Sequence, residues 1–186
     1  VSALITGIAA VHYLYMRDAY AAMGDEGVTA FRYVDWILTV PLMCVEFYLI
    51  LQKAGAPKSL LWNLIVLSTV MLVTGYVGEA GIGNAAFWGG VSGAAYFAIC
   101  YILWFGSAGE LANKAGGAVL EAFTALKWFV LVGWAIYPIG YMAGTDGWYS
   151  GIFSGLAGQM DVIYNVGDAI NKIGFGLVVY NLAVSK

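Results

Sequence analysis

The stretch from Phe31 to Leu51 reads FRYVDWILTVPLMCVEFYLIL and decides the fold. It is apolar and long enough to cross a bilayer as one helix, which takes roughly 20 residues. It nevertheless carries Arg32, Asp35 and Glu46, with Pro41 near its middle. Charges inside hydrocarbon cost about 3 kcal/mol each on insertion scales and commonly mark a site or a transport path. These three charges therefore predict a buried polar site on this helix.

The composition of the 186-residue chain places it among membrane proteins. It is 62% hydrophobic and 10% charged, with a mean hydropathy of +0.82, whereas a soluble domain carries about 25% charged residues. The net charge of −3 argues against nucleic acid as a partner. Cys44 and Cys100 lie in apolar stretches, so we expect buried thiols without a disulfide or metal role.

We expect an all-α membrane protein that forms one domain over residues 1–186. Turn-forming segments separate its apolar stretches. The expected spans are 1–16, 29–52, 58–78, 85–106, 119–143 and 161–183. The expected connections are 17–27, 52–59, 78–85, 106–117 and 144–158. The chain is apolar from residue 1 and lacks the positive segment of a signal peptide, so we expect its first helix to be entered partway.

The lysines and arginines of the connections predict the orientation. Six spans put both chain ends on one side of the membrane. That side also holds most of the basic residues, namely Lys53, Lys58, Lys114, Lys127 and Lys186, and the opposite side holds Arg17. Positive loops stay in the cytoplasm, so both ends of this chain should be cytoplasmic. The second and last spans then run from outside to inside.

The charges can also be placed in depth. Asp35 lies about two turns from the outer end of its span. Glu46 follows eleven residues later, which returns to nearly the same helix face roughly 16 Å deeper. Asp168 and Lys172 share one face of the last span at i, i+4, with Asp168 near the depth of Asp35. A lysine near mid-membrane with carboxylates on both sides predicts a path for protons.

Apolar surroundings favour the neutral amine of Lys172, which suits attack on an aldehyde to form a Schiff base. Asp35 and Asp168 would then supply the counter-charges. Other interpretations remain open. Asp168 and Lys172 can form a purely structural ion pair, a lone His12 is commonly a satisfied core histidine, and aromatic stripes are commonly packing.

Three motifs, RYVDWILTVPL (32–42), WAIYPIGY (134–141) and DAINKIGFG (168–176), together resemble the microbial (type 1) rhodopsins and most closely their proteorhodopsin group. The resemblance covers nearly the whole chain. That family has seven transmembrane helices with retinal on a lysine of the last. The six spans resemble its second to seventh helices, so we expect the first helix to be absent from this chain.

The resemblance assigns roles to the buried charges. Lys172 would bind all-trans retinal covalently, as a protonated Schiff base. Asp35 would be the main counter-ion and proton acceptor, Asp168 the second counter-ion, and Arg32 would lie below them. Glu46 would be the cytoplasmic proton donor.

The same resemblance assigns the remaining site residues. His12 would pair with the acceptor aspartate. The residues implied to line the polyene or to lie near its ends are Trp36, Met71, Gly75, Ser92, Trp134, Tyr137, Pro138 and Tyr141. Met43 would occupy the green/blue tuning position, where an apolar residue goes with green absorption. Gly89 would occupy the position where carotenoid-binding relatives have glycine, which predicts an accessory carotenoid; an ordinary helix-packing glycine is the alternative.

The second span predicts the subclass. Asp35, Thr39 and Glu46 match the acceptor–Thr–donor pattern of outward proton pumps, whereas sodium pumps of the family have Asn-Asp-Gln there and sensory members usually lack the donor. Apolar neighbours favour the protonated form of Glu46. We expect a light-driven outward proton pump, not an enzyme, in a bacterial-type plasma (inner) membrane, assembled as a pentamer or hexamer. The alternatives are a sensory rhodopsin and a retinal-free transporter with a structural Lys–Asp pair. No release group near the outer exit is evident.

Overall fold

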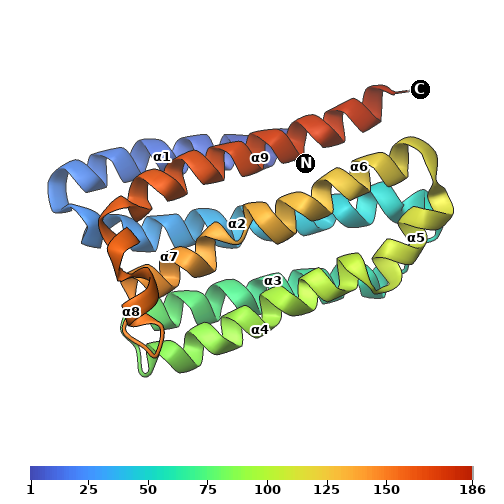
Figure 1. Cartoon of the computed structure of the whole chain (residues 1–186). Helices are drawn as coiled ribbons and strands as arrows, with labels where there is room; N and C mark the ends of the chain where they lie inside the picture. The colour runs from blue at the N-terminus through green and yellow to red at the C-terminus, as the bar shows by residue number, and fades with distance from the viewer. Residues whose placement is uncertain (186) are drawn as a thin grey trace.

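In the computed structural model, residues 1–185 are described, apart from the side chains of residues 25–27. The long helices lie roughly side by side along one common axis, which runs across the view in Figure 1. The α-helices are α1 Ser2–Met23, α2 Asp25–Leu51, α3 Lys58–Glu79, α4 Ala85–Trp104, α5 Ser107–Ala115, α6 Gly117–Trp128, α7 Ile136–Gly144, α8 Ser150–Phe153 and α9 Met160–Val184. Shorter segments are the 3₁₀ helices η1 Gln52–Ala54 and η3 Ser154–Gln159 and the π-helix η2 Phe129–Gly133.

The helices form a closed ring. Helix α1 packs against α2 and α9, α2 against α3, α3 against α4, and α4 against α6 and α7, which in turn pack against α9. Figure 1 shows α1 beside α9 and α3 beside α4, with α2, α6 and α7 between the two pairs. The start of α1 and the end of α9 point toward the end of the bundle that carries α5. The charged faces of α2 and α9 therefore turn toward the interior of the ring.

Five helical segments of the described residues are long and apolar enough to cross a membrane: 28–54, 58–79, 85–115, 117–144 and 150–184. Helix α1 completes the ring, and its 22 residues are also long enough to span. Large apolar side chains such as Phe97, Tyr101 and Phe105 are exposed on the outer faces, as expected where lipid is the solvent. The predicted all-α membrane fold with six helices in this chain is confirmed.

Two expected connections are wrong, because they are largely helical. Helix α1 continues to Met23 and α2 begins at Asp25, so Gly24, with φ 68°, makes the turn alone. The alanines of residues 19–22 favour helix, and glycine accepts the left-handed backbone at no steric cost. The 106–117 connection likewise contains α5, whose Ala, Leu, Glu and Lys residues are good helix formers.

The remaining connections follow the expectation more closely. The chain turns at 52–57, where Gly55 has φ 95°, and at 80–84, where the Asn84 side chain caps α4 by accepting from Phe87 N–H. The 144–158 segment contains the short α8 and part of η3. The fifth span was expected to be uninterrupted, but η2 and two further residues separate its halves, α6 and α7.

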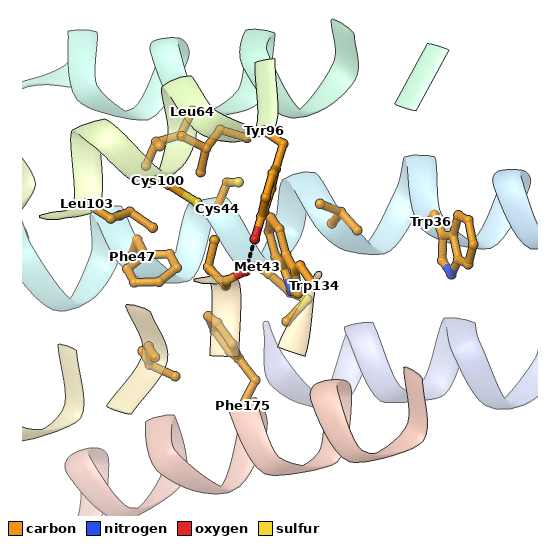
Figure 2. Close-up of a cluster of buried hydrophobic side chains, with 14 of the residues drawn as sticks. Trp36, Met43, Cys44, Phe47, Leu64, Tyr96, Cys100, Leu103, Trp134 and Phe175 are labelled. Carbon is orange, nitrogen blue, oxygen red and sulfur yellow. Dashed lines mark hydrogen bonds between the residues drawn. The ribbon is translucent and has the colours of Figure 1, made fainter. Parts of the chain in front are cut away.

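The core lies inside the ring and is mostly apolar and aromatic (Figure 2). Phe47 packs edge-on against Phe123 and Phe175, with ring centroids 5.7 Å and 5.5 Å away. Cys44 and Cys100 are buried free thiols. This packing fixes α2 against α6 and α9 and thereby positions the polar side chains that these helices carry.

Candidate functional site

A buried lysine and two buried aspartates form the centre of the site. The Lys172 amine donates to Asp35 Oδ2 across the ring and to Asp168 Oδ2, one turn earlier on α9, at 2.6 Å. None of the three is more than 3% exposed. Buried charges are tolerated when they are paired, and here one cation meets two anions. The structure thus brings together Lys172, which the sequence analysis places near mid-membrane, and the two aspartates that it places just outside it.

The two aspartates differ in their other hydrogen bonds. Asp168 accepts from the Tyr137 hydroxyl at 2.7 Å and from the Tyr13 hydroxyl at 2.9 Å. The second oxygen of Asp35, Oδ1, is buried and has no hydrogen-bond donor within the described part of the chain. Thr39 does not supply one, because its hydroxyl donates to the main-chain carbonyl of Asp35 at 2.9 Å. Asp168 therefore accepts two further hydrogen bonds, while one oxygen of Asp35 accepts none from the described residues.

Arg32 pairs with an aspartate that the sequence analysis did not select. Its guanidinium donates to Asp161 Oδ1 at 2.5 Å and lies 4.8 Å from the centre of the Tyr164 ring. Asp161 precedes Asp168 by seven residues, which is two turns on the same helix face, so its spacing could have revealed it. Within the described part of the chain, Arg32 forms an ion pair with Asp161 and none with Asp35.

Two more polar residues of the site were missed. Tyr13 of α1 donates a hydrogen bond to Asp168, and no spacing in the sequence predicts this contact. Glu79 ends α3 and accepts a hydrogen bond from the Tyr33 hydroxyl at 2.8 Å. The sequence analysis placed Glu79 in a connection, which is why it was not considered.

Among the described residues, His12 forms no hydrogen bond or ion pair with Asp35. Its Nδ1 atom lies 3.0 Å from the Ile8 carbonyl of its own helix, and the side chain is partly buried. The pairing of His12 with the acceptor aspartate therefore remains a prediction.

Glu46 lies on α2 three turns beyond Asp35 and is only 2% exposed. One oxygen accepts a hydrogen bond from the Ser2 hydroxyl of α1, and the other, Oε2, is buried without a partner in the described residues. The neighbouring Cys44 and Phe47 are buried as well. The apolar surroundings expected for Glu46 are present, with Ser2 as an added polar contact.

A largely apolar cavity of about 540 Å³ adjoins the ion cluster. Ligand cavities of drug-sized molecules range over roughly 300–1,000 Å³. Of the residues predicted to surround a polyene, those that line it are Trp36, Met71, Gly75, Ser92, Trp134, Tyr137, Pro138 and Tyr141. Tyr137 belongs to both the cavity and the ion cluster, so the cavity reaches the Asp168 side of that cluster.

Met43 is the exception. It does not line the cavity, although Val40, one turn earlier, does. Its side chain is buried in the core, and Figure 2 shows it in the same group of side chains as Trp134. The assignment of Met43 to the tuning position therefore remains a prediction.

Glycines shape the cavity walls. A methyl group added at Gly75 would lie 3.1 Å from the Tyr33 hydroxyl, and one added at Gly89 would lie 2.5 Å from the Tyr141 ring. Side chains at these positions would therefore fill the space or displace its aromatic walls. An apolar cavity with aromatic walls, joined to the ion cluster through Tyr137, suits a largely apolar ligand.

Comparison with known proteins agrees with this geometry. The family described as bacteriorhodopsin-like protein matches residues 1–186. The chain is 46% identical to a green-light absorbing proteorhodopsin from Gamma-proteobacterium EBAC31A08, over 100% of this chain and 73% of the relative.

Solved structures of similar proteins share the fold of this chain. A blue light-absorbing proteorhodopsin from Med12 superposes with a TM-score of 0.78 at 40% identity, covering 98% of this chain and 79% of that one. Xanthorhodopsin, described as a light-driven ion pump with dual chromophore, superposes with a TM-score of 0.76 at 30% identity, covering 98% of this chain and 77% of that one.

Proposed function

The chain belongs to the bacteriorhodopsin-like protein family, and on this premise we propose that it is a light-driven outward proton pump with all-trans retinal on Lys172. One observation carries the proposal. The Lys172 amine is held between two buried carboxylates, and a largely apolar cavity of about 540 Å³ with aromatic walls adjoins this cluster through Tyr137. The similarity to a proteorhodopsin over the whole chain supports a light-driven pump of the rhodopsin fold.

The chain's own residues divide the proton chemistry between them. When bound, retinal would supply light absorption and a light-driven change of shape beside the Lys172 nitrogen. The Lys172 nitrogen would hold the transported proton in the dark. Asp35 would accept it after illumination, because its Oδ1 atom is free of donors in the described chain. Asp168 would stay ionised, because Tyr13 and Tyr137 stabilise its charge.

The direction follows from the positions of Glu46 and Arg32. Glu46 lies on the side of Lys172 toward the lysine-rich connections, which the positive-inside rule puts in the cytoplasm. Burial there favours a protonated carboxyl that can resupply Lys172. Arg32 and Asp161 lie on the opposite side of the cluster. Protons would therefore enter past Glu46 and leave past Asp35 and Arg32.

The chain is a multi-pass membrane protein. We place it in the bacterial inner membrane with its C-terminus in the cytoplasm and regard it as a transporter that catalyses no substrate chemistry. Its exposed aromatic and aliphatic faces suit packing against lipid or against further copies. A pentamer or hexamer, as is common in the family, remains part of the proposal.

Illumination of cells tests this function against its alternatives. Added retinal should give a visible colour, and light should acidify the medium. A protonophore should abolish that acidification. Colour without acidification would favour the sensory alternative, and no colour would favour a retinal-free transporter with a structural Lys–Asp pair.

A further inference from the structure

The helix that carries Trp134 and Pro138 is interrupted by η2 (Phe129–Gly133). In a regular α-helix each N–H bonds to the carbonyl four residues earlier. Three N–H groups here bond elsewhere: Trp134 to Phe129 at 3.0 Å, Ala135 to Val132 at 3.3 Å and Tyr137 to Trp134 at 3.1 Å. The carbonyls that lose their usual donors are those of Val130, Leu131 and Gly133.

Two side chains from other helices donate hydrogen bonds to these three carbonyls. The Tyr96 hydroxyl of α4 lies 2.7 Å from the Leu131 carbonyl and 3.2 Å from that of Val130, and Figure 2 shows the dashed line that leaves this hydroxyl. The Asn171 amide of α9 donates to the Gly133 carbonyl at 2.9 Å. Carbonyls without donors are costly in a dry interior, so these two side chains stabilise the irregular turn in the resting protein.

Helix α9 holds η2 from both sides of Lys172. Asn171 directly precedes the lysine, and a methyl group added at Gly133 would overlap the Asn171 side chain. Gly174 follows the lysine by two residues, and a methyl group there would lie 2.6 Å from the Phe129 ring. A displacement of Lys172 is therefore transmitted to η2 through close contacts at both of its ends.

The α6 side of η2 covers the route to the proposed donor. Phe123 and Leu126 of α6 are fully buried. Phe123 packs on Phe47, which is the sequence neighbour of Glu46. Glu46 is itself buried, and this apolar layer lies beside it on α2. Motion of α6 about η2 would thin the layer.

We propose that Tyr96 and Asn171 are positioning residues that latch η2, and that release of this latch sets how fast protons reach Glu46. The proposal rests on the proposed function, because it concerns the resupply of the Lys172 nitrogen. Neither side chain handles the proton itself. Each acts through the carbonyls of η2 and the orientation of α6.

Two variants remove the latch bonds and keep the outline of the side chain: Tyr96→Phe, which loses only the hydroxyl, and Asn171→Leu, which has the same number of heavy atoms. Their matched controls are Tyr101→Phe, exposed on α4, and Asn181→Leu, exposed on α9. Losing one net hydrogen bond should speed the recovery of visible absorption after a flash by about two- to tenfold. Amide hydrogen exchange in the dark should also rise at Trp134 and Ala135 in both variants, and neither control should change either quantity.

The latch would be overturned if, in both variants, amide exchange at Trp134 and Ala135 is unchanged and visible absorption recovers no faster than in the parent. If a variant fails to fold or to take up retinal, the proposal is tested by amide exchange of the unaltered protein in light and in the dark. Continuous light should raise amide exchange within residues 129–137 but not in the middle of α3, and equal exchange in light and dark would reject the proposal. If light raises amide exchange in residues 129–137 but illuminated cells do not acidify their medium, the pump is refuted while the latch stands.

Discussion

Asp35 and Asp168 contact the same lysine, yet only Asp168 has its charge stabilised by further donors. Tyr13 and Tyr137 both donate to Asp168, whereas Asp35 Oδ1 has no donor in the described residues. Hydrogen bonds to the charged form of a carboxyl favour that form. This difference in hydrogen bonding is the basis on which we propose Asp35 as the proton acceptor and Asp168 as the second counter-ion.

Lys172→Ala should abolish the visible pigment on addition of retinal, because the remaining lysines lie in or near the connections. In this variant Asp35 and Asp168 lose their cationic partner, which can destabilise the protein. Helix content should therefore be measured alongside the spectrum. Lys127→Ala is the matched control, since Lys127 lies 4.2 Å over the Trp104 ring, away from the ion cluster. A coloured Lys172→Ala protein would show that retinal is attached elsewhere.

The parent protein should absorb in the green, and Met43→Gln should shift its absorption to the blue. A polar amide on this face of α2 would favour positive charge localised at the Lys172 nitrogen. Because Met43 does not line the cavity, the effect would act through Trp134 and its surroundings. Met23→Gln, on an exposed methionine, serves as the control. An unchanged spectrum in Met43→Gln would remove the tuning assignment.

At the residue scale, the sequence predicted the buried charges well and their partners poorly. Charges in an apolar span stand out, and i, i+4 spacing is enough to pair Asp168 with Lys172. The contacts of Tyr13 with Asp168 and of Arg32 with Asp161 depend on how α1, α2 and α9 meet. Helix periodicity within one span carries no information about that packing.

At the element scale, Gly89 on α4 supports both of its interpretations. It packs directly against the Tyr141 ring, as a helix-packing glycine would, and it lines the cavity wall. The proposed accessory carotenoid would lie against this wall, outside the retinal cavity. One relative described as having a dual chromophore shares the fold.

A hydroxylated carotenoid should therefore transfer excitation to retinal in the parent protein and stop doing so in Gly89→Trp. The bulky indole would displace Tyr141 and close the wall. Gly7→Trp, where an added side chain meets open space on α1, is the control. Excitation spectra of retinal fluorescence measure the transfer, and its absence with every carotenoid tried would leave the packing interpretation alone.

Helix boundaries were predictable where glycine, proline or asparagine forces a turn, as at Gly55 and Asn84. They were not predictable at residues 17–27 or 106–117, where polar composition suggested loops but helix-forming residues prevailed. The π-helix η2 was also missed. It depends on Tyr96 and Asn171 from other helices, so no local pattern in 119–143 could have revealed it.

At the scale of the whole molecule, the ring of helices encloses three buried polar groups in an otherwise mostly apolar core. Glu46, Lys172 with its two aspartates, and Arg32 with Asp161 follow one another along α2 and α9. The resemblance of three short motifs to the proteorhodopsin group is confirmed over the full chain. The proposed direction of transport rests on the lysine-rich connections at the α5 end, which the positive-inside rule places in the cytoplasm.

The most direct test of outward pumping is flash spectroscopy of membranes containing Glu46→Gln, at two pH values, with charge movement recorded. Removing a positioned proton donor should slow the recovery of visible absorption by roughly 100-fold or more. Recovery should then depend on protons from the bulk cytoplasm and slow further as pH rises. One outward charge movement per flash should persist, and Glu121→Gln, exposed on α6, should behave like the parent. Recovery as fast as in the parent and independent of pH would contradict the donor role of Glu46 and, unless illuminated cells still acidify their medium, the pump itself.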